Sequence, residues 1–96
     1  MNKVLYKYIL GPDDLTILSL PKGARIVHCG YQKKYAHSPD PFYNLCFWAS
    51  VDTTKPLVER KFYIVATGEE YSEALLYVGT IVIDNGTVWH IMEEVL

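Results

Sequence analysis

Histidine is the first residue type in this sequence that could do chemistry, because three histidines could hold a metal ion. His28 and His90 lie in segments with a β-strand pattern, and His37 lies in a polar segment. None of them shows the short spacings that join the ligands of a zinc site. We therefore predict no metal site and no cofactor. Hydrogen-bonded sheet histidines are the favoured interpretation, although His28, His90 and Trp89 could belong either to the core or to a binding site.

A thiol nucleophile is the second chemistry that the sequence could offer. Cys29 follows His28 directly, but neighbouring residues of a strand point to opposite faces. His90 could approach Cys29 or Cys46 in space, yet nothing in the sequence places a helix N-terminus or a cationic pocket beside either thiol to lower its pKa. A structural role for both cysteines is the favoured interpretation. We predict that the protein is not an enzyme and has no catalytic residues.

A polar and aromatic segment over residues 31–43 is the best candidate for a binding element. It reads YQKKYAHSPDPFY, so two lysines and a histidine are interleaved with four aromatic residues. Aromatic rings stack on bases or anchor protein interfaces, and ammonium groups bind phosphates. A long hairpin connection whose aromatic side chains pack back on the sheet explains the pattern equally well. The candidate binding residues, one of them from the following strand, are Tyr31, Lys33, Lys34, Tyr35, His37, Phe42 and Trp48.

The elements that must position these residues are short β-strands separated by turns. Alternation is cleanest over residues 44–52, where Phe47 falls on an apolar face and Trp48 on the other. The third strand is expected to carry Ile26 and His28 on the same face. Apolar and alternating patterns predict strands over residues 3–10, 15–20, 24–30, 44–52, 61–67, 77–84 and 87–92.

Two connections carry stronger local signals. Asp84-Asn85-Gly86 separates two β-branched segments and predicts a hairpin with a type I′ turn, which needs two positive φ angles. Residues 68–76 are compatible either with about two turns of helix or with an irregular loop. We predict a single mainly β domain over residues 1–96. It should have about seven short, mostly antiparallel strands in a small sandwich or open barrel, with at most one short helix.

Size and charge restrict the class of partner. A chain of 96 residues buries one thin core, so a sizeable ligand would lie on the surface or between subunits. The net charge of −2 argues against general DNA or RNA binding. The first ten residues do not have the pattern of a signal peptide, and no stretch is apolar enough for a membrane helix. Two cysteines are too few for a disulfide framework, so we expect a cytoplasmic protein with both reduced.

An ordered set of short motifs runs through nearly the whole chain. In order, these motifs are Tyr6-Lys7-Tyr8, Leu20-Pro21-Lys22-Gly23-Ala24, Ile26, His28, Leu45-Cys46-Phe47-Trp48-Ala49, Val51-Asp52, Glu59-Arg60, Phe62, Thr67-Gly68, Tyr77, Gly79-Thr80 and Trp89-His90. Their order and spacing resemble a family of small phage and prophage proteins with no assigned function. The resemblance implies a viral or prophage origin but no reaction and no site residues. It also implies a shorter turn between the third and fourth strands, so residues 31–43 look like an insertion.

Together these observations predict a non-enzymatic phage accessory protein that binds and neutralises a host component, above all one of antiviral defence. It would act in the host cytoplasm. It would either block a host protein through its aromatic residues or sequester a small nucleotide signal, with Lys33 and Lys34 on the phosphates. A homo-oligomer is expected, since a pocket between subunits is easier to form than one inside a thin core. The alternative is a minor structural or assembly protein of the phage particle.

Overall fold

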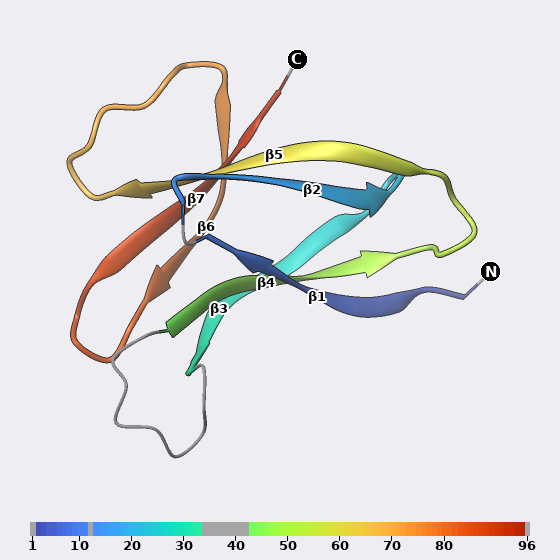
Figure 1. Cartoon of the computed structure of the whole chain (residues 1–96), viewed down its shortest axis with the longest axis horizontal. Helices are drawn as coiled ribbons and strands as arrows, with labels where there is room; N and C mark the ends of the chain where they lie inside the picture. The colour runs from blue at the N-terminus through green and yellow to red at the C-terminus, as the bar shows by residue number, and fades with distance from the viewer. Residues whose placement is uncertain (1, 12, 34–42, 96) are drawn as a thin grey trace.

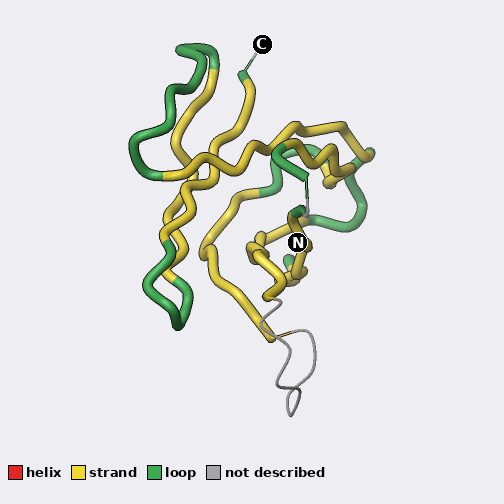
Figure 2. The backbone as a smooth tube through the Cα atoms, turned by 60° about the vertical axis from the view of Figure 1, so that its left-hand side comes forward, coloured by secondary structure: helices red, strands yellow, loops and turns green. Residues whose placement is uncertain are grey.

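The computed structural model describes residues 2–11, 13–33 and 43–95, which form two antiparallel β-sheets and no helix. Figures 1 and 2 show strands and connecting loops throughout this part of the chain. No helix that could cross a membrane occurs in it. The predicted β-rich fold with seven strands is confirmed as a small sandwich that does not close into a barrel. The strands are β1 (Val4–Leu10), β2 (Leu15–Pro21), β3 (Arg25–Lys33), β4 (Tyr43–Val51), β5 (Leu57–Ala66), β6 (Leu75–Val82) and β7 (Val88–Glu94).

Sheet A takes its three strands from the first 51 residues, whereas sheet B combines β2 with the last three strands. Sheet A has the order β1-β4-β3, and sheet B has the order β2-β5-β7-β6. The connections from β1 to β2, from β2 to β3 and from β4 to β5 therefore cross between the sheets (Figure 1). This arrangement leaves β1 and β3 at the edges of sheet A, and β2 and β6 at the edges of sheet B.

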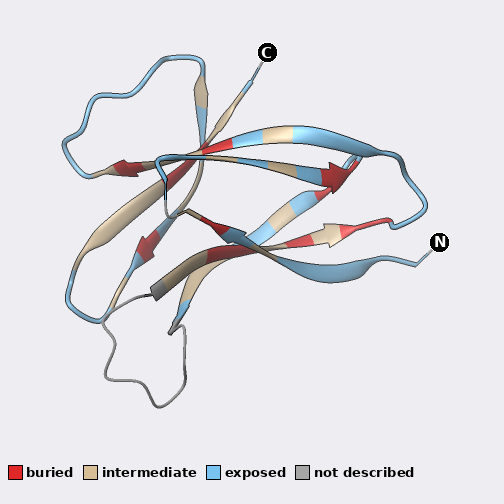
Figure 3. Cartoon of the chain, in the orientation of Figure 1, coloured by how far each residue is buried: buried red, intermediate tan, exposed pale blue. Residues whose placement is uncertain are grey.

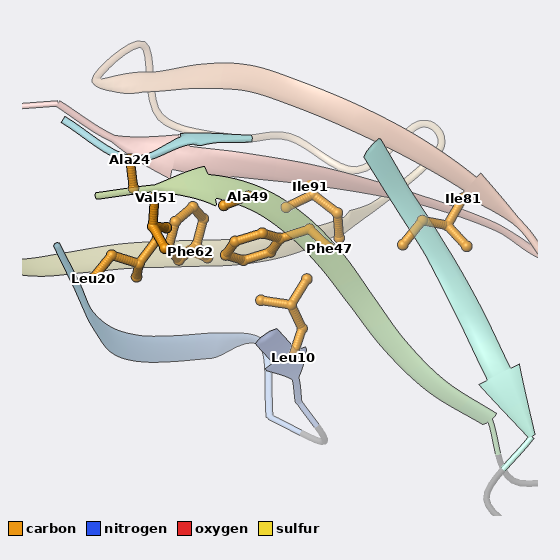
Figure 4. Close-up of a cluster of buried hydrophobic side chains, with 9 residues drawn as sticks. All are labelled: Leu10, Leu20, Ala24, Phe47, Ala49, Val51, Phe62, Ile81 and Ile91. Atoms are coloured by element: carbon orange, nitrogen blue, oxygen red, sulfur yellow. The ribbon is translucent and has the colours of Figure 1, made fainter. Parts of the chain in front are cut away.

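The core lies between the two sheets and is centred on Phe47 of β4. Phe47 is fully buried, and its ring centroid lies 5.3 Å from that of Tyr8 and 4.9 Å from that of Phe62. Leu10 and Ile91 approach the same rings from β1 and β7 (Figure 4). The predicted alternation of β4 is confirmed, because its odd-numbered residues from 45 to 51 face this core.

Arg60 joins the two sheets at the margin of the core. Its guanidinium donates two hydrogen bonds to the Glu93 carboxylate, from Nε at 2.6 Å and from Nη2 at 2.7 Å. Its Nη1 donates a third, 2.7 Å long, to the carbonyl oxygen of Ala24, just before β3. Two-point contacts of this kind between Arg and a carboxylate fix geometry as well as charge. Arg60 therefore links β5 and β7 of sheet B to the start of a strand in sheet A.

Strand boundaries differ from the sequence-based expectation at several points. β3 continues through Lys33, and β4 begins at Tyr43, so both ends of the segment expected to be a loop belong to the sheet. β5 begins at Leu57 rather than at residue 61, because it pairs with the whole of β2. Residues 67–74 form an irregular connection rather than a helix, which agrees with the weakness of two isolated helical turns.

The hairpin between β6 and β7 is confirmed, but its predicted turn type is wrong. The amide of Gly86 donates to the carbonyl oxygen of Ile83, while Gly86 has a φ of 85°. No described residue other than glycine has a positive φ, so Asn85 does not adopt the conformation that a type I′ turn requires. The geometry is a type I turn followed by a left-handed glycine, which is the common three-residue hairpin. The side chain of Asn85 instead accepts a hydrogen bond from the amide of Thr87.

Two bulges change which side chains face the core. In β3 the register shifts between Ile26 and His28, so Ile26 faces the core while His28 points outward beside Trp48. The expectation that these two residues share a face is therefore wrong, because a bulged residue between them shifts the alternation. In β6 the register shifts between Tyr77 and Gly79. The two bulged strands lie next to each other on the β3–β6 side of the sandwich (Figure 1).

Asp52 caps the turn between β4 and β5, and its hydrogen bonds predict that the stability of the protein depends on pH. Its Oδ1 accepts hydrogen bonds from the amide of Thr54 at 3.0 Å and from its hydroxyl at 2.6 Å, and these bonds lower the pKa of the Asp52 carboxyl. The stabilisation should be complete above the ordinary carboxyl pKa of about 3.9 and should be lost as the pH falls through the lower pKa of the folded state. We expect the difference in Tm between the wild type and Asp52→Ala to narrow between about pH 6 and about pH 2. A difference independent of pH would show that the carboxylate charge does not stabilise this turn.

Candidate functional site

The outward-facing surface of sheet A combines aromatic, apolar and basic side chains. In the middle of this sheet, Trp48 of β4 is paired with Lys7 of β1 on one side and with His28 of β3 on the other. Alternation along the strands adds two exposed apolar residues of β1 and a glutamine of β3 to the same face. We call this surface the outer platform, and its residues are Leu5, Lys7, Ile9, His28, Gln32 and Trp48.

A glycine shapes the aromatic centre of the outer platform. The rings of His28 and Trp48 lie with their centroids 5.7 Å apart and tilted by 35°. A Cβ at Gly30 would lie 3.3 Å from the Trp48 ring and 3.5 Å from His28 Nε2. Both rings therefore lie against the backbone of β3 at Gly30, which leaves Trp48 half-buried and His28 exposed.

The basic part of the outer platform is a cross-strand contact. Lys7 Nζ donates a 2.6 Å hydrogen bond to Gln32 Oε1, although the two residues lie on opposite edge strands of sheet A. Cys46 of the central strand is fully buried beneath this face, and its thiol donates to the carbonyl oxygen of Gly30 at 3.6 Å. The platform therefore carries the ammonium group of Lys7, which this hydrogen bond directs across the sheet towards Gln32.

Two of the predicted binding residues, Tyr31 and Trp48, point to opposite faces of sheet A but line the same groove. Tyr31 faces the inside of sheet A, and its hydroxyl donates to the carboxylate of Asp84 in the β6–β7 turn. Trp48 faces outward from the neighbouring strand. Both nevertheless line a groove of about 310 Å³ between β3 and β6, together with His28 and Thr80. The remaining candidates, Lys34, Tyr35, His37 and Phe42, lie outside the described residues, as does the side chain of Lys33.

The connection between β5 and β6 builds a second recess that was not recognised in the sequence. It folds over the outer face of sheet B, where Val65 is 7% and Met92 3% exposed despite facing away from the core. The recess has a volume of about 250 Å³ and is also lined by Tyr71 and Tyr77. The sequence contained one sign of a covered outer face, which is the alternation of β7. It places the apolar residue Met92 on the face opposite the core residue Ile91.

His90 forms the polar corner of this recess. Its Nε2 lies 2.8 Å from Thr67 Oγ1, and its Nδ1 lies 2.9 Å from Thr80 Oγ1. The Tyr77 hydroxyl lies 2.5 Å from the same Thr80 oxygen. The interpretation of His90 as a hydrogen-bonded sheet histidine is confirmed. Both nitrogens of His90 therefore have hydroxyl partners, and the network orders this corner of the recess.

The cysteines are placed as structural residues. Cys29 faces the core side of β3, whereas Cys46 lies on the opposite side of sheet A, and both thiols are free. Burial raises the pKa of the Cys29 thiol, and Cys46 raises it further. Burial also raises the pKa of the Cys46 thiol, with Lys7 opposing the change. Thiols with raised pKa values are mostly protonated near neutral pH and are poor nucleophiles. The described residues contain no group of three metal-binding side chains.

Comparison with known proteins gives a family for the chain. Residues 1–96 match the family described as "Domain of unknown function (DUF7352)". The chain belongs to this family. No curated protein matches the sequence, and no solved structure matches it. The match spans the whole chain, and its description agrees with the expectation of a family with no assigned function.

Proposed function

We propose that this DUF7352 protein is a non-enzymatic binding protein that uses the outer platform to contact a protein partner. The outer platform carries the proposal. Leu5 is 64% and Ile9 49% exposed on it, next to the half-buried ring of Trp48 and the ammonium group of Lys7. Exposed apolar side chains grouped around an aromatic anchor and bordered by polar groups are typical of protein interfaces.

The charges around the pockets favour a protein over a nucleotide. Four pockets formed by the described residues contain no lysine or arginine in their linings. One of them is lined by four carboxylate residues, Asp14, Glu69, Glu70 and Glu94. Carboxylates repel phosphate groups, and a nucleotide site normally provides cations or clustered backbone amides instead. Within the described residues, these four pockets thus support the sequestration of a nucleotide less than the outer platform supports the blocking of a protein surface; Lys34 and the side chain of Lys33 lie outside those residues.

The proposal also includes a biological role. We infer that the protein is a phage accessory factor that neutralises a host component, above all one of antiviral defence, in the host cytoplasm. The motif resemblance supports this role, and the raised pKa values of both thiols are in keeping with a protein that acts by binding.

Affinity capture with paired variants tests the platform. The immobilised wild type is incubated with bacterial lysate, beside His28→Glu on the platform and Leu57→Glu on sheet B. His28 is exposed, and Leu57 is 67% exposed, so either substitution should leave the fold intact. We expect a discrete protein to be retained by the wild type and by Leu57→Glu, and to fall at least about tenfold with His28→Glu. If the two variants retained equal amounts of this protein, the outer platform would not be the contact surface.

A plating assay tests the biological role separately. The wild type and His28→Glu are expressed in bacteria that carry a known defence system, and a phage that the system restricts is plated on each strain. We expect the wild type to restore plating and His28→Glu to fail at equal expression. Unchanged restriction across a panel of defence systems would contradict the role in defence, while leaving the capture result valid.

A further inference from the structure

The four edge strands of the sandwich are of two kinds. β3 and β6 each contain a bulge, and they approach each other closely, since a Cβ added at Gly79 would lie 2.7 Å from Cys29 Sγ. β1 and β2 pair with their single neighbours in an unbroken register along their whole lengths. Bulges and close coverage are two ways in which native sheets prevent their edges from pairing with other chains. Within the described residues, β1 and β2 have neither form of protection.

β1 is the better pairing strand of these two. β2 ends in Pro21, which has no amide hydrogen to donate. β1 contains no proline, and it exposes apolar residues on both of its faces: Leu5 and Ile9 on the outer face, and Val4 (42% exposed) and Tyr6 (47%) on the inner one. Most of β1 is therefore pale blue in Figure 3. A regular edge of seven residues that is apolar except for Lys7 can serve as a template for another strand.

We propose that β1 pairs with β1 of a second copy of this chain, so that the protein is a homodimer. A two-fold axis perpendicular to the sheet makes the two strands antiparallel and keeps each face on its own side. The two β1 strands then bring the exposed apolar side chains of Val4 and Tyr6 together on the inner face of the joint, and a partner strand with a polar inner face would not match them. The pairing joins two copies of sheet A into one continuous sheet.

Charge selects the register of the pair. Directly opposed residues of antiparallel strands have their side chains on the same face of the sheet. The two-fold axis must therefore set one residue opposite the same residue of the second copy, because an axis between two residues would oppose side chains from different faces. An axis at Lys7 would set two ammonium groups opposite each other, which is unfavourable. An axis at Tyr6 sets Lys7 of one copy opposite Leu5 of the other and pairs the two Tyr6 rings. An axis at Tyr8 would also separate the two lysines, but Tyr8 packs on Phe47 in the core, so we place the axis at the exposed Tyr6.

The dimer goes beyond the proposed function, because it needs no outside partner. It also has a consequence for that function. The axis keeps the two outer platforms on one face of the joined sheet, so they lie side by side and form a bivalent surface. A partner with two matching sites would be held far more tightly than by one platform.

Analytical ultracentrifugation of the purified full chain tests the dimer. We expect the wild type to sediment as a dimer at micromolar concentration. Tyr6→Lys should be a monomer, because it places like charges on the axis. Ile17→Lys on β2, at a site of similar exposure (51%), should remain a dimer. Circular dichroism checks that both variants fold. A monomeric wild type, or dissociation by Ile17→Lys but not by Tyr6→Lys, would overturn the proposal.

Cysteine crosslinking tests the register. Under mild oxidation Tyr6→Cys should give a covalent dimer, because the two thiols face each other across the axis. Val4→Cys is similarly exposed, has no cysteine opposite it in its own chain and lies far from its own copy in this register, so it should stay uncrosslinked. Crosslinking by Val4→Cys in preference to Tyr6→Cys would reject the axis at Tyr6. Neither result depends on the platform binding a partner, so the dimer and the proposed function can fail separately.

Discussion

Replacing Phe47 by alanine should lower the free energy of unfolding by about 3–5 kcal/mol, the usual loss for a buried phenylalanine. Phe47 is fully buried, and it packs between the rings of Tyr8 and Phe62, which come from different sheets. The substitution therefore opens a cavity at the point where sheet A meets sheet B. Domains of this kind are stable by only about 5–15 kcal/mol, so a large share of the variant should be unfolded near its physiological temperature. Urea unfolding followed by circular dichroism measures the loss.

Trp48→Ala is the matched control, because Trp48 follows Phe47 directly and faces the other way. Its ring lies half-buried against His28 and Gly30 on the outer platform. A side chain that remains partly in water contributes less burial, so Trp48→Ala should destabilise the protein clearly less than Phe47→Ala. An equal or larger loss from Trp48→Ala would mean that the outer face of sheet A is covered and is not a platform.

Gly79→Ala should be the most damaging single methyl addition in the strands, with an expected loss of about 1–3 kcal/mol from overpacking. The new Cβ would lie 2.7 Å from Cys29 Sγ and 3.2 Å from Cys29 Cβ. The first distance is closer than van der Waals contact allows, so β6 must move away from β3. Thermal unfolding of the wild type and the variant, each monitored by circular dichroism, gives the difference.

Two further variants identify the cause of that loss. Gly30→Ala is the control, since its Cβ would lie 3.3 Å from the Trp48 ring and 3.5 Å from His28 Nε2, and we expect a smaller effect. Cys29→Ala removes the sulfur that causes the shortest contact. Combined with Gly79→Ala, it should cost less than the two single losses added together. Additive losses would show that the contact between β3 and β6 does not cause the damage.

The seven strands could be predicted because most of them alternate. The odd-numbered residues of β4 are apolar, so the face that Phe47 occupies follows from the sequence alone. The bulges could not be predicted in the same way. The bulge before His28 depends on how β3 fits β4 and β6, and nothing local marks it. The predicted turn type at Asn85 was wrong because local sequence did not decide it. The same Asn-Gly pair occurs in two hairpin geometries whose loops differ by one residue in length.

The candidate site could be predicted only in part. Trp48 was recognised from its residue type, but its neighbours Lys7 and His28 come from two other strands, and only the register brings them together. The recess beside His90 depends on an irregular connection folding over sheet B, which has no periodic signal. The packing of segments that are distant in the sequence thus determines which residues form the outer platform and the recess. A periodic pattern within one strand does not show which other strands will lie beside it.

Native mass spectrometry tests the central claim most directly, which is that this protein binds a protein partner and not a nucleotide. The protein is purified gently from bacterial cells and measured before and after incubation with a nucleotide-rich lysate. We predict that it gains the mass of a discrete protein, and that His28→Glu on the outer platform does not. A discrete added mass of nucleotide size on the wild type would contradict the account and would establish the sequestration of a small nucleotide.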